Sequence, residues 1–145
     1  MKHRILTAAA TLAVLLSLAV VAGAQTRKKI EATIRFDFVA GESRLKAGDY
    51  SVIRVSDKAF LLRSADGKSK AIVLAPIAIR QREEGSPERL VFKRYGNEYF
   101  LAQVWSDRTG DGHGLYPAKA EARLAKQVEQ RNSAPQTIEV FAKTK

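Results

Sequence analysis

The most regular pattern in the chain lies between Ile30 and Phe38, where apolar and polar residues alternate without a break. The apolar positions are Ile30, Ala32, Ile34, Phe36 and Phe38. A period of two predicts a β-strand with one face in a core and the other in water. We therefore expect one continuous strand over residues 30–38.

Shorter apolar runs, separated by turn residues, follow this segment. They predict strands over residues 50–55, 60–62, 69–74, 90–92, 99–105 and 137–142. Asp66-Gly67 and Gly96-Asn97 predict hairpin turns, because these residues tolerate the positive φ angles that tight turns require. Pro76 cannot donate to a β-ladder, so we expect the strand before it to end, bulge or lie at a sheet edge there. Ile77 and Ile79 are candidates for an extension of this strand beyond the proline.

The strand predicted over residues 99–105 is apolar on both faces. One face carries Tyr99, Leu101, Gln103 and Trp105, and the other carries Phe100, Ala102 and Val104. This pattern predicts a central strand that is covered on both sides.

A helix predicted over residues 117–131 is the candidate cover. Pro117 suits its first position, and Leu124, Ala125 and Val128 form an apolar stripe at helical spacing. The whole pattern predicts a mainly β fold, an antiparallel roll, sandwich or partial barrel of about seven strands with one helix in the C-terminal region.

The first 24 residues have the features of a signal peptide. Lys2 and Arg4 precede an uncharged stretch that ends in Ala22-Gly23-Ala24, a small-residue cleavage site. We expect cleavage near Ala24, a single mostly β domain over residues 25–145, and a periplasmic or extracellular location. The alternative is an N-terminal membrane anchor, because the stretch is close to the length that spans a bilayer.

The chain contains no cysteine. Disulfides, thiol chemistry and zinc–thiolate sites are therefore excluded, and so is lipid attachment to a cysteine at the cleavage site. Removal of Lys2 and Arg4 with the signal lowers the net charge from +10 to +8. A basic protein outside the cytoplasm favours an anionic envelope component as its partner, and nucleic acid is not expected. Mixed, solvated surface charge is the alternative interpretation, and the oligomeric state stays open.

Potential reactive groups concentrate in the segment 106–114. Asp107, Asp111 and His113 are weak candidates for metal ligands, although their spacing matches no calcium loop. The glycines here also fit a flexible connection between a strand and a helix. No catalytic residue and no cofactor are predicted. A small enzyme or a metal-dependent protein that uses this segment is the alternative to a non-enzymatic protein.

Several motifs together resemble a group of small exported bacterial proteins of unknown function. They are Phe36-Asp37-Phe38, the turn 45–50 (Leu-Lys-Ala-Gly-Asp-Tyr), the hairpin 90–101, and Trp105 with residues 121–125. Lys46 stands where the group leads us to expect proline. The resemblance implies export and an antiparallel β domain, and it implies no catalytic residue. We expect an exported, non-enzymatic binding or accessory protein with a basic surface.

Overall fold

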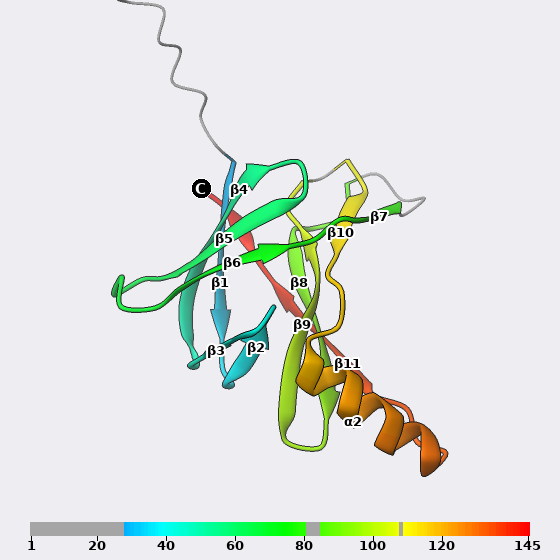
Figure 1. The fold of residues 1–145 in the computed structure, drawn as a ribbon. Helices are drawn as coiled ribbons and strands as arrows, with labels where there is room; N and C mark the ends of the chain where they lie inside the picture. The colour runs from blue at the N-terminus through cyan, green and yellow to red at the C-terminus, as the bar shows by residue number, and fades with distance from the viewer. Residues whose placement is uncertain (1–27, 81–84, 108) are drawn as a thin grey trace, which may run out of the picture.

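The computed structural model describes residues 28–80, 85–107 and 109–145, and these form two β-sheets and one helix (Figure 1). The predicted signal peptide over residues 1–24 lies outside the described residues. In the part of the chain that is described, no helix is both long enough and apolar enough to cross a bilayer.

The first sheet has five strands in the order β12-β1-β4-β5-β6. Their bounds are β1 Lys29–Ile34, β4 Gly48–Ser56, β5 Ala59–Ser64, β6 Lys70–Leu74 and β12 Lys143–Thr144. All neighbours in this sheet are antiparallel.

The second sheet has seven strands, with the order β11-β8-β9-β10-β7 along its main path. These strands are β7 Ile77–Arg80, β8 Arg89–Tyr95, β9 Glu98–Trp105, β10 Asp111–Gly114 and β11 Gln136–Phe141. The hairpin of β2 (Phe38–Ala40) and β3 (Ser43–Leu45) joins this sheet through a parallel pairing of β2 with β9. The predicted mainly β class is confirmed, and the two sheets stay open instead of closing into a barrel.

The single strand predicted over residues 30–38 is wrong, because the chain turns a corner within it. β1 belongs to the five-stranded sheet and β2 to the seven-stranded sheet. Asp37 fixes the corner by accepting hydrogen bonds from Lys46 Nζ at 2.7 Å and from the Ala47 N–H at 3.0 Å. Phe36 packs face to face on the Tyr99 ring, with centroids 4.0 Å apart. The apolar alternation continues through the corner because both sheets line the same core.

The chain passes between the sheets at three further places. β3 ends at Leu45 in the seven-stranded sheet, and β4 begins at Gly48 in the five-stranded sheet. β6 ends at Leu74 and β7 begins at Ile77, so the expected interruption at Pro76 is confirmed. The strand predicted over 137–142 is β11, and beyond the buried Ala142 the chain enters the unpredicted strand β12. The described residues form twelve strands where about seven were predicted. The strand predicted over 30–38 is divided, the extension considered at Ile77 and Ile79 is the separate strand β7, and β3, β10 and β12 were not predicted.

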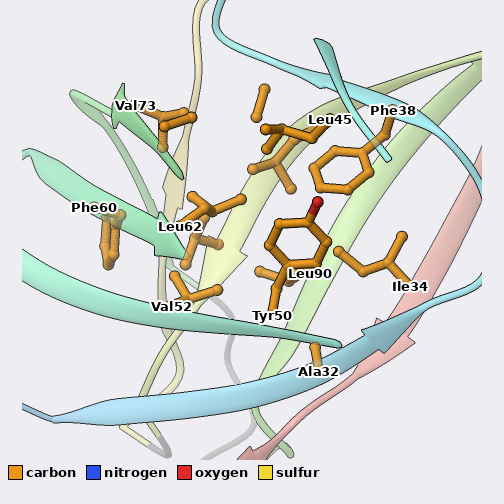
Figure 2. Close-up of a cluster of buried hydrophobic side chains, with 14 of the residues drawn as sticks. Ala32, Ile34, Phe38, Leu45, Tyr50, Val52, Phe60, Leu62, Val73 and Leu90 are labelled. Carbon is orange, nitrogen blue, oxygen red and sulfur yellow. The ribbon is translucent and has the colours of Figure 1, made fainter. Parts of the chain in front are cut away.

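The core between the sheets draws on both of them. Figure 2 shows Ala32 and Ile34 of β1, Tyr50 and Val52 of β4, and Leu90 of β8 directed into this shared space. The Tyr50 hydroxyl donates to the Lys46 carbonyl at 2.8 Å, which gives the one polar atom of that side chain a partner. Buried polar groups generally need such a partner.

β9 lies between β8 and β10, and a side chain cluster covers each of its faces, as predicted. The predicted division of its residues between the faces is wrong. The pairing with β8 passes from Val91↔Gln103 to Phe92↔Leu101, which leaves Ala102 as a bulge. One extra residue reverses the alternation, so Leu101 and Val104 both enter the core between the sheets.

Helix α2 (Lys119–Gln130) supplies the cover for the outer side of the seven-stranded sheet (Figure 1). Its predicted stripe of Leu124, Ala125 and Val128 packs on a cluster that includes Tyr95 and Phe100. The helix starts later than predicted, because Ala118 is the N-cap and Pro117 precedes it.

Candidate functional site: the outer face of the five-stranded sheet

The predicted ligand residues Asp107, Asp111 and His113 lie in two different settings. Asp107 forms ion pairs with Lys28 at 3.6 Å and Arg54 at 3.7 Å. Asp111 and His113 belong to strand β10, so the expectation of a loop throughout 106–114 is wrong. Asp111 lies 3.8 Å from Arg80 on the paired strand β7.

His113 packs beside Phe60, with ring centroids 5.2 Å apart. Burial and the Arg54 charge lower the pKa of its imidazole, while Asp107, the Ala75 backbone and Asp111 oppose that shift. Within the described ranges, no three His, Asp or Glu side chains gather in a way that suits a metal ion. The metal-binding hypothesis therefore gains no support from this arrangement.

Two glycines of this segment, Gly112 and Gly114, allow close packing of strand β10. A Cβ at Gly112 would lie 2.6 Å from two carbons of the Trp105 ring, so the indole rests directly on the β10 backbone. The Arg89 guanidinium also lies over the indole, 4.3 Å from the ring centroid. Because α2 begins only at Lys119, these glycines do not form its N-terminus.

The aromatic residues near Lys93 and Arg94 are mainly part of the packing. Tyr95, Phe100 and Trp105 are buried, and Tyr99 stacks on Phe36. Tyr116, 68% exposed, is the exception.

The outer face of the five-stranded sheet carries a different kind of surface, with no helix over it in the described chain (Figure 1). The strand registers place its side chains in rows that run across the strands. One row, the cation row, is Lys143, Glu31, Ser51, Arg63 and Lys70, from β12 to β6. Strands about 4.8 Å apart make this row about 19 Å wide.

The three cations of this row are exposed and have no carboxylate partner within 4 Å among the described residues. Glu31 is already engaged by Lys29 at 2.8 Å and Lys145 at 3.5 Å. Arg63 and Lys70 lie directly opposite each other on β5 and β6. Like charges in that position destabilise a sheet.

The next row is apolar and lies beside the cation row. It consists of Ile53, Leu61 and Ile72, with Lys29 at its β1 end. Leu74 belongs to the row beyond, opposite Ala59. Ile72 is 70% exposed and Leu74 is 68% exposed, so this apolar surface is open to solvent.

Two open depressions of about 390 Å³ each flank Glu31 on this face. Lys29, Arg63 and Lys145 line one, and Asp49, Phe141 and Lys143 line the other. A depression of about 280 Å³ beside Val128 of α2 shows that hollows also occur elsewhere. The charge pattern therefore distinguishes this face more than its hollows do.

The hydrophobic pattern of the sequence does not single out this face, although one local signal points to it. Arg63 and Lys70 flank the predicted Asp66-Gly67 turn, so a hairpin register would have placed them as neighbours. The pairing of Lys143 with Glu31 had no such local signal.

Comparison with known proteins assigns neither a family nor a function to this chain. No family model, characterised protein or solved structure matches this chain. The resemblance to small exported bacterial proteins therefore stays a prediction.

Proposed function

We propose that the protein is an exported, non-enzymatic binding or accessory module that holds an anionic envelope partner on the outer face of its five-stranded sheet. One observation carries the proposal. Arg63 and Lys70 oppose each other across β5 and β6, and no carboxylate of the described residues lies within 4 Å of either. An anionic partner relieves the repulsion between Arg63 and Lys70. The repulsion itself contributes nothing to the stability of the fold.

The strength of the interaction follows from the exposure of the three cations. Exposed ion pairs contribute about 0.5 kcal/mol each, so three give about 1.5 kcal/mol, or roughly tenfold in affinity. Salt is expected to weaken the binding, since charges in water are screened beyond about 10 Å at 0.1 M.

The test compares two variants of equal net charge for binding to an isolated envelope fraction at increasing salt. The first removes the cation row with Arg63→Gln, Lys70→Gln and Lys143→Gln. The matched control removes three exposed cations at helix α2 with Arg123→Gln, Lys126→Gln and Arg131→Gln.

We expect the first variant to bind about tenfold more weakly and the control to bind within twofold of the wild type. The first variant is also expected to be at least as stable as the wild type, because it removes the Arg63–Lys70 repulsion. Equal binding by the two variants would refute the proposed function, since net charge alone would then explain the interaction.

A further inference from the structure

Strand β6 is the terminal strand of the five-stranded sheet, and its second edge has no strand beside it in the described chain. Figure 1 shows β6 leaving the sheet toward β7, so both strands lie at sheet ends. An unpaired edge presents a row of backbone donors and acceptors to any extended chain that comes alongside.

The register identifies which backbone groups of β6 face this edge. The Ser64 N–H donates to the Ser69 carbonyl at 2.9 Å, and the Ala75 N–H donates to the Lys58 carbonyl at 2.8 Å. Hydrogen-bonded residues alternate along an antiparallel pair, so Ala71 and Val73 also bond toward β5. The N–H and C=O groups of Lys70, Ile72 and Leu74 therefore point away from the sheet.

The side chains at this edge add an apolar surface to the open backbone. Ile72 and Leu74 are more than two-thirds exposed, and Leu61 lies beside Ile72 on the same face. Proteins usually protect a sheet edge with charge, proline or a bulge. Here Lys70 stands at one end and Pro76 follows the other, and the five residues between them, 71–75, are all apolar.

We propose that this edge accepts an extended polypeptide segment as a sixth, antiparallel strand, with apolar residues opposite Leu74 and Ile72 and an acidic residue opposite Lys70. This inference rests on the proposed function and narrows its anionic partner to a polypeptide. Backbone hydrogen bonds supply the attachment, and the alternate side chains supply the selectivity.

Charge complementarity favours such a partner over a second copy of this chain. Antiparallel pairing places the C-terminal end of the partner segment beside Lys70, with Lys68 just beyond it in the turn. Arg63 adds a third positive charge next to Lys70. Two copies of the exported chain, each with a net charge of +8, would repel each other, and their β6 strands bring no acidic residue to this edge.

The probe is a fluorescein-labelled peptide, Thr-Val-Thr-Val-Thr-Glu-Thr-Glu, which places valine opposite Leu74 and Ile72 and glutamate opposite Lys70. Its control is the same peptide with both valine nitrogens methylated, which removes two backbone donors and keeps every side chain. We expect the control to bind the purified protein at least tenfold more weakly by fluorescence anisotropy. Hydrogen exchange at the Ile72 amide is expected to slow when the unmodified peptide binds.

Two protein variants separate the backbone edge from the side chain. Ile72→Pro removes an outward N–H without touching the bonds to β5, and is expected to weaken peptide binding at least tenfold. Ile72→Thr keeps the N–H and is expected to bind within about threefold of the wild type. Far-UV circular dichroism checks that both variants keep the fold.

Three results would overturn the inference. In the first, the methylated peptide binds as tightly as the unmodified peptide. In the second, Ile72→Thr loses as much peptide affinity as Ile72→Pro. In the third, the protein sediments as a dimer and Ile72→Pro abolishes that dimer. The cation-row comparison shares Lys70 and Arg63 with this inference, but its variants keep the β6 backbone on which these three results depend. The inference can therefore fail while the proposed function stands.

Discussion

Replacement of Gly112 by alanine tests the contact that holds β10 against β9. An added Cβ would lie 2.6 Å from Trp105 Cδ2 and Cε2 and 2.8 Å from Cε3. Two other contacts hold the ring in place, because Arg89 lies 4.3 Å from its centroid and Nε1 donates to Gln103 Oε1 at 2.9 Å. β10 is also held, since β9 and β7 pair with it on both sides.

The magnitude follows from the displacement that the contact requires. Ordinary contacts begin near 3.4 Å, so ring and strand must separate by roughly 0.8 Å. Overpacking of this kind lowers the free energy of unfolding by about 1–3 kcal/mol. Because the neighbours of Trp105 are held in place, we expect Gly112→Ala to lose about 3 kcal/mol, near the upper limit. With an unfolding entropy of about 0.25 kcal/mol/K for a domain of about 120 residues, Tm falls by about 12 °C.

Thermal unfolding followed by circular dichroism measures this change, and Trp105, the only tryptophan, reports it by fluorescence. Gly114→Ala is the matched control. Its Cβ would meet Ile77 and Ile79 side-chain atoms at 3.2–3.3 Å, so we expect a cost of only about 1 kcal/mol. In a Trp105→Leu background, Gly112→Ala is expected to cost less than about 1 kcal/mol, because the ring is absent. The same 3 kcal/mol loss in both backgrounds would refute the steric explanation.

Two carboxylates give predictions with opposite pH dependence. Burial raises the pKa of Glu121, so the folded state binds its proton more tightly and loses stability as pH rises above 4.5. Glu121→Gln is therefore expected to raise Tm at pH 7 and to flatten this decline, and a lower Tm at pH 7 would contradict the reasoning. The hydrogen bonds from Lys46 and the Ala47 N–H lower the pKa of Asp37, so its contribution is present above pH 3.8 and is lost as pH falls further. Asp37→Asn should lower Tm at pH 7 and leave it unchanged near pH 2, which thermal melts at the two pH values can check.

The elements that could be predicted from the sequence are those with local causes. The Asp66-Gly67 turn joins β5 to β6, and the Gly96-Asn97 turn joins β8 to β9, as their residues indicate. The apolar stripe of α2 was also recognisable, because its partners on the sheet need only be apolar. Each of these features depends on residues that are close together in the chain.

The corner at Asp37 and the bulge at Ala102 had no comparable signal. Alternation predicts which side chains enter a core, and it is the same whether one sheet or two sheets line that core. The bulge is visible only in the register between β8 and β9. The candidate site could not be predicted for the same reason. Lys143 lies in one row with Arg63 and Lys70 only because β12 pairs with β1 and β1 pairs with β4, and both pairings join distant parts of the chain.

The pairing of β1 with β12 also has a consequence for the time course of folding. Ile30 lies opposite Thr144, so the five-stranded sheet joins residues that are 114 positions apart. Closing a loop of that length costs about 4 kcal/mol of chain entropy before the contact contributes anything. Pairings between distant segments also make folding slow, in the range of milliseconds to seconds. A growing chain therefore cannot complete this sheet until residues 143–144 have been synthesised, and until then β1 keeps one edge open to the chaperones it meets.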